Sequence, residues 1–351
     1  MFGKLRQGLG CGLDVIGCDT GIVVRADRSL SHSILRGRLG GGMDDRRDIL
    51  HLFIIGNGFD MGHGLSTRYW DFRTYLERLD PKFLYAFEEH YYLYPGMSNE
   101  SKASLLWNEL ETNLANIDED IIIENAVSIE MDLDSGDVGI EDTLYNYFSD
   151  EYSYIKKLPG YLKQWVRTIR IKGVAPKSSL ITPDNFYITF NYTAVLENVY
   201  QVSPSNILHI HGSLREYDID PVLGHGNQKR IESIKEKKDE ANRLFDEKWA
   251  SICRAVEDYY LRTYKKVEKY SSSLYSLSKM EIDGISVIGH SLAGVDRTYF
   301  RAIDTLTGGK LIWKVYYYSE NDVDSLKRNL IDAGVDEVRI RMISSSKFYD
   351  L

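Results

Sequence analysis

The sequence predicts an α/β fold of the Rossmann-like type, an open, mostly parallel sheet with helices on both faces and helical insertions. Three observations predict it. The short apolar run Ile49–Ile55 stops at a glycine-rich turn, as buried parallel strands do. Strand, helix and strand signals follow one another over 185–211, which is the unit of a parallel sheet. From residue 285 onward, short strands alternate with amphipathic helices.

The elements can be assigned in chain order. We expect strands at 49–55, 185–190, 206–211, 285–288, 311–318 and 338–343. We expect helices at 67–79, 193–200, 297–306 and 323–333. The first of these helices is indicated by Phe72, Leu76 and Leu79, whose spacing of three and four residues puts them on one face.

Residues 43–351 are predicted to form a single domain with helical insertions at about 82–175 and 228–280. The first insertion is aromatic and acidic, and Pro159-Gly160 is expected to interrupt a helix within it. Residues 228–268 are predicted to form one long charged helix with an apolar stripe.

Residues 1–42 differ from the rest of the chain. They contain 10 of the 28 glycines and carry six basic against three acidic residues, so their net charge is +3 and that of residues 43–351 is −12. They show neither a helical nor a strand period. We interpret them as a poorly ordered extension, and a native start at Met43 would leave them out of the protein.

Composition excludes several classes of protein. Apolar residues make up 43% and charged residues 27%, which is typical of a soluble globular protein. No apolar run approaches the roughly 20 residues that span a bilayer, so no membrane association is expected. A net charge of −9 argues against broad nucleic-acid binding. Only three cysteines are present, which fits a reducing cytosol and predicts a cytoplasmic protein.

The first candidate site follows the opening strand, at Gly56-Asn57-Gly58-Phe59-Asp60. Glycine lets a backbone approach a ligand closely, and a following helix would aim free N–H groups at a phosphate. The dinucleotide-binding motif has a third glycine where this chain has Met61. Asp60 would repel a pyrophosphate, so it could bind a ribose hydroxyl or cap a helix instead. His63 is a further candidate contact.

Two more motifs follow predicted strands. The Asn191 amide, beside Tyr192, can both donate and accept a hydrogen bond, and a helix N-cap is its alternative role. His209 and His211 point to the same face of their strand, directly before Gly212. These two histidines could be core groups, a metal pair or a general base.

Two loops complete the set of candidates. Gly289-His290-Ser291, with Asp296 shortly after, is a turn at a strand end that suits a ribose or phosphate contact. His225 stands between two glycines, so its own neighbours cannot bury it. We expect it to be a loop residue, with a functional and a structural role equally open.

These motifs, in this order, resemble the bacteriophage abortive-infection family AbiH. The resemblance covers about residues 50–345. The matching residues are Ile54–Asp60, His63–Leu65, Tyr69, Phe72, Trp107, Glu111, Phe190–Thr193, Leu196-Glu197, His209–Gly212, Gly224–Gly226, Gly289–Ser291 and Asp296. It implies a phage-defence protein that stops the growth of infected cells.

A more distant resemblance links the chain to sirtuin-type NAD-binding domains. It implies that Gly56, Gly58 and Phe59 line the nucleotide, that Asn191 orients a water or the ribose, that His211 is the general base and that Ser291 reaches the adenosine ribose. The chain departs from that pattern at Asn57 and Asp60, where alanine and serine are favoured. It also lacks the zinc-binding cysteine quartet, which argues against protein deacetylation.

The leading hypothesis is therefore a defence enzyme that binds NAD as substrate or ligand and hydrolyses it or a related nucleotide. The candidate catalytic residues are Asn191, His211 and His225. The candidate nucleotide contacts are Gly56, Asn57, Gly58, Phe59, Asp60, His63, Tyr192, Gly212, Gly289, His290, Ser291 and Asp296.

Two alternatives stay open. No resident metal is predicted, but the Asp and His residues are also the types that would serve a metal-dependent phosphoesterase or nuclease. The chain could equally be a nucleotide sensor without turnover. In each case the expected partners are a small nucleotide, a phage-derived trigger and a second copy of the chain.

Overall fold

The computed structural model describes residues 49–117, 119, 152–266 and 272–350. Within these residues six strands form one sheet, and every strand pairing is parallel. The strands are β1 (Leu50–Ile55), β2 (Phe186–Thr189), β3 (Ile207–His209), β4 (Ile282–Ile288), β5 (Trp313–Tyr317) and β6 (Ile340–Ser344). The predicted α/β class is confirmed, and each predicted strand is present. The predicted extension, residues 1–42, lies outside the described residues.

The strand order, β3-β2-β1-β4-β5-β6, places β1 and β4 at the centre of the sheet. β1 pairs with β2 on one side and with β4 on the other. The chain winds outward from β1 to β3 and then returns to begin the second half at β4. In open α/β sheets, ligands bind outside the carboxyl ends of the strands at such a reversal. Here those ends are Ile55 and Ile288.

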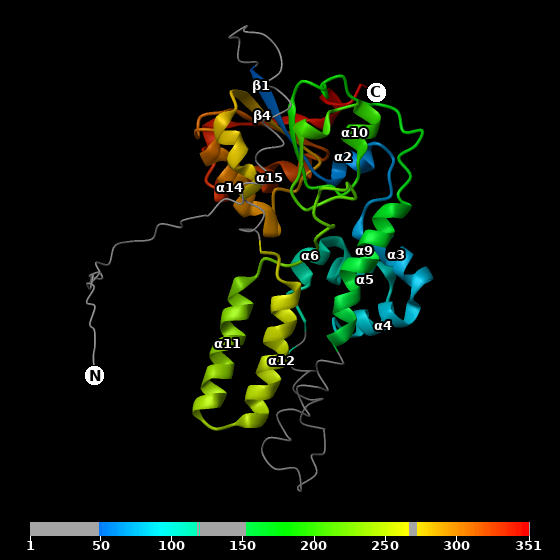
Figure 1. Ribbon diagram of the computed structural model, residues 1–351, viewed down its shortest axis with the longest axis vertical. Helices are drawn as coiled ribbons and strands as arrows, with labels where there is room; N and C mark the ends of the chain where they lie inside the picture. The colour runs from blue at the N-terminus through cyan, green and yellow to red at the C-terminus, as the bar shows by residue number, and fades with distance from the viewer. Residues whose placement is uncertain (1–48, 118, 120–151, 267–271, 351) are drawn as a thin grey trace, which may run out of the picture.

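Helices cover both faces of the sheet (Figure 1). Side chains of successive strand residues point to opposite sides, so each strand packs against helices on both faces. Leu52 and Ile54 pack with α14 (Arg297–Leu306) and α15 (Val323–Asp332). Phe53 and Ile55 pack with α2 (Asn57–Gly62) and α10 (Val195–Tyr200). Both faces of the central strand are therefore buried, which explains its uninterrupted apolar sequence.

A layer of helices, drawn beneath the sheet in Figure 1, is built from α3 (Tyr69–Leu79) and the two insertions. Its other helices are α4 (Pro81–Glu89), α5 (Asn99–Leu105), α6 (Leu110–Asn113), α9 (Leu158–Thr168), α11 (Gln228–Arg243) and α12 (Glu247–Thr263). One apolar cluster joins them, with Phe72 of α3 and Trp107 of the first insertion packed together with Val256 and Tyr260 of the second. The two insertions therefore share one core.

Short 3-10 helices connect these elements. They are η1 (Trp107–Glu109), η2 (Tyr152–Lys157), η3 (Pro204–Asn206), η4 (Ser272–Lys279), η5 (Gly294–Asp296), η6 (Glu320–Asp322), η7 (Glu337–Arg339) and η8 (Ser345–Lys347).

The prediction of one long helix over 228–268 is wrong, because α11 and α12 are separate helices that form a hairpin. Phe245 adopts a φ of 57° between them. The Asp246 side chain then accepts a hydrogen bond from Trp249 N at 2.9 Å and caps α12. The boundary between α11 and α12 is therefore marked in the sequence by an aspartate N-cap. The apolar stripe continues across that boundary, and for this reason the sequence pattern predicts one helix.

The predicted interruption of a helix at Pro159-Gly160 is displaced by one residue, because the 3-10 helix η2 ends at Lys157 and α9 begins directly before the pair. Helix α9 begins at Leu158, so Pro159 occupies its first turn. A proline is tolerated there because the N–H that it lacks would have no partner within the helix.

A buried ionic cluster ties helix α3 to the first insertion. The Glu88 carboxylate accepts hydrogen bonds from Arg73 Nε at 2.6 Å, from Lys102 Nζ at 2.9 Å and from Trp107 Nε1 at 2.8 Å. Burial raises the pKa of Glu88, but the bonds from Arg73 and Lys102 outweigh it, so the pKa lies below its usual value. Loss of any one donor would leave a buried charge without its partner.

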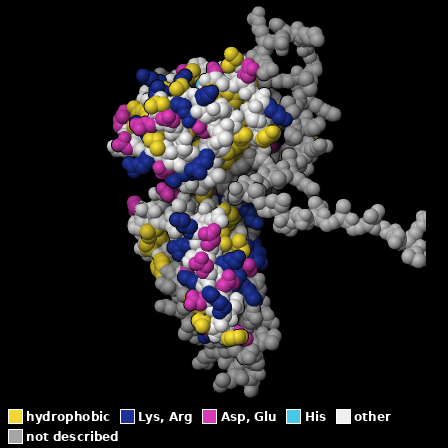
Figure 2. Space-filling model, turned by 90° about the vertical axis from the view of Figure 1, so that its left-hand side faces the viewer, with side chains coloured by type: hydrophobic (Ala, Val, Ile, Leu, Met, Phe, Trp, Pro, Cys, Tyr) yellow, Lys and Arg dark blue, Asp and Glu magenta, His cyan; other side chains and the backbone are white. Residues whose placement is uncertain are grey.

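Figure 2 shows Lys and Arg side chains interspersed with Asp and Glu over the elongated lower part of the molecule. On that face the charges are mixed rather than gathered into a field of one sign. Within the described part of the chain, no helix has both the length and the apolar character to cross a membrane.

Candidate active site

The glycines of the first motif are required by the packing of two turns against each other. Gly58 N donates a hydrogen bond to Gly289 O at 2.8 Å. A Cβ on Gly58 would lie 2.7 Å from Gly289 Cα, and a Cβ on Gly56 would lie 2.5 Å from Gly289 O. The Gly289 φ of 66° also favours glycine. These glycines therefore need no phosphate to explain them, and a phosphate contact at this turn stays a prediction.

Asp60 lies in helix α2, directly after this turn, and its carboxylate is held by two side chains from the end of β2. Asn191 Nδ2 donates to Oδ1 at 2.8 Å, and Thr193 Oγ1 donates to Oδ2 at 2.5 Å. The residue is only 1% exposed. Burial raises the pKa of Asp60 to about 6, although both hydrogen bonds oppose that rise. The carboxylate therefore titrates close to neutral pH.

Asn191 joins the carboxyl ends of β1 and β2. Besides Asp60, its Nδ2 donates to Gly56 O at 3.1 Å. The backbone carbonyl oxygen of Asn191 accepts a hydrogen bond from His209 Nδ1 at 3.0 Å, and His209 Nε2 lies 2.9 Å from Glu197 Oε1. His209 is thus a buried residue that positions the Asn191 backbone.

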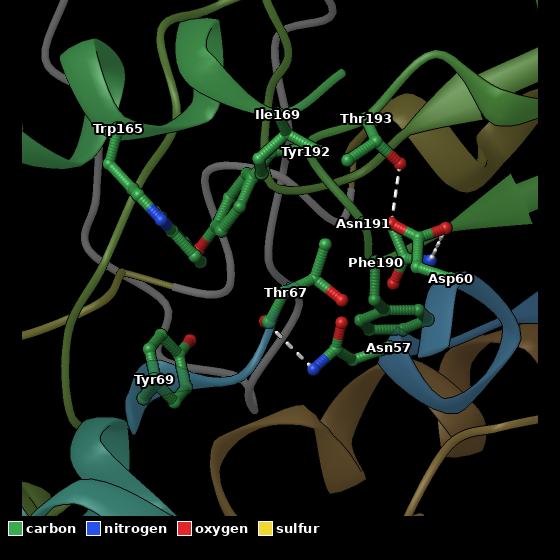
Figure 3. A pocket seen from close by; sticks show the side chains of 10 residues that line it. All are labelled: Asn57, Asp60, Thr67, Tyr69, Trp165, Ile169, Phe190, Asn191, Tyr192 and Thr193. Atoms are coloured by element: carbon green, nitrogen blue, oxygen red, sulfur yellow. Dashed lines mark hydrogen bonds between the residues drawn. The ribbon is translucent and has the colours of Figure 1, made fainter. Parts of the chain in front are cut away.

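A cavity of about 80 Å³ lies beside Asp60, between the sheet and the helical layer. Its lining residues are Asn57, Asp60, Thr67, Tyr69, Trp165, Ile169, Phe190, Asn191, Tyr192 and Thr193. Figure 3 shows Trp165, Tyr192 and Tyr69 on one side of it, and Phe190 together with Asp60 on the other. None of these lining residues is Lys or Arg. The cavity therefore suits a planar group with hydrogen-bond donors better than it suits a phosphate.

A second polar cluster lies on the far side of Phe190, around His211. The Phe190 ring contacts the rings of His211 and His290, with centroids 5.1 Å and 4.4 Å apart. His211 Nε2 is 3.1 Å from Asp296 Oδ1, and His290 Nε2 is 3.4 Å from Asp296 Oδ2. His211, two residues after β3, and His290, two residues after β4, thus meet at one carboxylate.

Lys265 and Glu111 complete this cluster. Lys265 Nζ donates to Glu111 Oε1 at 2.6 Å and to His211 Nδ1 at 3.1 Å, and it lies 3.9 Å from Asp296 Oδ1. Glu111 was noted only through the family resemblance, and no sequence signal marked Lys265.

The charges of the cluster set its protonation. Burial, followed by the Lys265 ammonium, lowers the pKa of His211. Burial raises the pKa of Asp296, but His211 and Lys265 outweigh it and hold the pKa well below its usual range. At neutral pH the cluster therefore contains a neutral imidazole beside an ionised carboxylate.

A comparison of the chain with known protein families identifies its family. The model of a family described as "Bacteriophage abortive infection AbiH" matches residues 52–317. The chain belongs to the AbiH family. The match includes both polar clusters and both helical insertions, and it gives the chain a role in phage abortive infection. No curated protein matches the chain. The likeness to sirtuin-type domains stays a prediction.

Of three further predicted site residues of this AbiH chain, His63 and Ser291 do not line the cavity, whereas Tyr192 does. His63 is buried, with Nδ1 2.8 Å from Phe59 O and Nε2 2.7 Å from Tyr200 OH. The Tyr192 ring lines the cavity while its hydroxyl donates to Val222 O. Ser291 accepts a hydrogen bond from Asn329 through its backbone oxygen. A nucleotide contact at His63 or Ser291 therefore stays untested by this geometry.

His225 is not the exposed loop residue that its flanking glycines suggested. It is fully buried, because Tyr260 and Tyr264 of the second insertion pack against its ring. Its Nε2 lies 3.2 Å from Tyr260 O, and its Nδ1 accepts from Asn227 N at 3.1 Å. Burial lowers the pKa of His225 to about 4. Both ring nitrogens therefore serve the backbone, which favours the structural role.

The Asp and His residues do not assemble into a metal centre in the part of the chain that the structure describes. No group of three or more His, Cys, Asp or Glu there could hold a metal ion. His63, His209 and His225 each have both ring nitrogens engaged with protein atoms. In the remaining cluster the Lys265 ammonium already lies between the acidic groups.

Proposed function

We propose that this AbiH chain acts in abortive infection as a hydrolase that cleaves a nucleotide at the Asp60 cavity, with NAD as the first candidate substrate. One observation carries the proposal. A buried carboxylate with a pKa of about 6 lies in the wall of a cavity at the carboxyl edge of a doubly wound sheet. Catalytic groups need pKa values near the working pH, and the cavity is at the usual ligand position of this fold.

The roles of the residues follow from their contacts. The Asp60 carboxylate takes a proton from water, and Asn191 and Thr193 hold its two oxygens in place. The aromatic rings of Tyr69, Trp165 and Phe190 pack against a planar base. Because no basic residue lines the cavity, the phosphates of a nucleotide would lie outside it.

The proposed reaction balances without a further reactant. Water oxygen bonds to the anomeric carbon of the ribose as the bond from that carbon to the nicotinamide nitrogen breaks. The bonding electron pair neutralises the pyridinium ring, and the proton of the water passes to Asp60. The products are nicotinamide and ADP-ribose. Asp60 suits the role of base better than His211, since Lys265 donates to His211 Nδ1.

The test measures NAD in cells and in the purified protein. NAD should fall in phage-infected cells that produce the wild-type chain, and purified protein should release nicotinamide. Asp60→Asn and Asn191→Ala should each reduce the rate by about 100-fold or more. The matched control is Asp304→Asn, because Asp304 is also a buried aspartate but pairs with Arg339.

Two outcomes contradict the proposal. Either NAD stays constant in infected cells that the wild-type chain protects, or Asp60→Asn releases nicotinamide as fast as the wild type does. Two features favour one second candidate, a sensor that binds a nucleotide without turnover. The cavity is small, and the turn at Gly56 and Gly58 is packed against Gly289. Saturable binding of ADP-ribose with unchanged ligand would support that alternative.

A further inference from the structure

Lys265 is one of the most deeply buried charged groups of the protein. The residue is 1% exposed, and its ammonium contacts Glu111, His211 and Asp296, which come from three different segments. A lysine is rarely fully buried unless its charge is paired. The position of this ammonium therefore depends on the protein bringing acidic partners to it.

The loop around His225 holds Lys265 in place. Lys265 N donates to His225 O at 2.8 Å, and His225 N donates to Thr263 O at 2.8 Å. Gly224 allows this pairing, because a Cβ there would lie 2.6 Å from Thr263 O and 3.0 Å from Lys265 N. The Gly224–Gly226 motif is thus explained by a backbone clamp that fixes the segment after α12.

The ammonium also decides where His211 carries its proton. Lys265 Nζ has only donors to offer, so His211 Nδ1 must accept the hydrogen bond between them. An imidazolium would turn Nδ1 into a donor that faces the ammonium. A neutral His211 therefore has its proton on Nε2.

The proton on Nε2 lacks an aligned acceptor. Nε2 and Asp296 Oδ1 are 3.1 Å apart, yet neither atom has a hydrogen bond of acceptable geometry, and both atoms are buried. Buried polar atoms are seldom left without a partner. Asp296 is nevertheless the charged group that lies next to Nε2, so this contact holds the ring in this orientation.

We infer that Lys265 is a positioning residue that holds His211 as a neutral imidazole with its proton on Nε2, the nitrogen that lies next to the Asp296 carboxylate. This tautomer belongs to the resting protein and does not depend on the proposed function. The groups that face His211 are Lys265, Asp296 and Glu111, together with the Tyr299 ring at 5.5 Å. Lys265 is the single cation among these described neighbours.

The test is histidine ring ¹⁵N NMR of the full chain without ligand. In the wild type, His211 should show an unprotonated Nδ1 and a protonated Nε2 throughout the neutral range. In Lys265→Met, the His211 titration midpoint should rise by about one pH unit or more, because Asp296 and Glu111 then act without the opposing cation. The matched control is Lys102→Met, an equally buried lysine that pairs with Glu88.

A proton on Nδ1 in the wild type overturns the inference, and this outcome needs no variant to fold. An unchanged His211 titration in Lys265→Met overturns it too. Gly224→Ala should displace the clamp and shift the His211 signals, whereas Gly96→Ala should not, since a Cβ on Gly96 meets no atom within 4 Å. NMR does not depend on turnover, so failure here and failure of the NAD assay are separate results.

Discussion

Replacement of Asp60 by asparagine should stabilise the protein at neutral pH while it abolishes activity. Asparagine has nearly the shape of aspartate, and it can keep both contacts. Its oxygen can accept from Asn191, and its amide can donate to the Thr193 hydroxyl. What disappears is the cost of an ionised carboxylate in a buried place.

The magnitude follows from the pKa of Asp60, which burial raises from 3.8 to about 6. Between these two values the folded protein binds a proton more tightly than the unfolded chain does, so the free energy of unfolding falls as pH rises. Each pKa unit corresponds to about 1.4 kcal/mol, which gives a loss of about 3 kcal/mol once Asp60 is ionised. The stabilisation by Asp60→Asn should therefore be near zero at pH 3.5 and about 3 kcal/mol at pH 7.5.

Urea unfolding of both proteins across this pH range measures the effect. Asp304→Asn provides a control of opposite sign, because the bonds from Arg339 hold the pKa of Asp304 below its usual value despite burial. That variant should destabilise the protein at neutral pH by about 2 kcal/mol. The reasoning about Asp60 is refuted if Asp60→Asn is less stable than the wild type at pH 7.5, or if the difference does not change with pH.

Three further predictions concern the elements around the site. Gly58→Ala should destabilise the protein by about 1–3 kcal/mol in urea unfolding, because its Cβ would lie 2.7 Å from Gly289 Cα, while Gly96→Ala should be close to neutral. The low pKa of His225, about 4, makes the protein lose stability as pH falls from 6.5 to 4, and His225→Gln should reduce that loss in acid unfolding curves. Phe245→Gly should raise the free energy of unfolding by about 0.5–1 kcal/mol, because Phe245 is 90% exposed at a positive φ; a loss of stability would favour a continuous helix instead.

Local patterns predicted the strands well, because each strand is a short apolar run that ends in glycine or a polar residue. The same patterns also brought Asp60 and Asn191 to one place, since carboxyl ends of parallel strands meet at one edge. Strand order could not be predicted, because it depends on pairings between residues far apart, such as Ile54 with Val287.

The sequence could not predict the partners of the site, for the same reason. Local sequence suggests a phosphate-binding role for Gly58. The packing against Gly289 that explains this glycine is made only in the folded protein, so the sequence does not reveal it. Lys265 lies in a segment without any motif, and only folding brings it to Glu111, 154 positions away in the chain. His225 stands between two glycines, and the residues that bury it, Tyr260 and Tyr264, come from a distant segment that the local sequence does not reveal.

The shared core of the two insertions also constrains synthesis. The ion pair of Lys265 and Glu111 joins the second insertion to the first, and Asp296 follows after β4. A chain still on the ribosome cannot assemble this cluster until Asp296 has emerged, which is late in the sequence. Prematurely ended chains would therefore lack the complete cluster around Lys265.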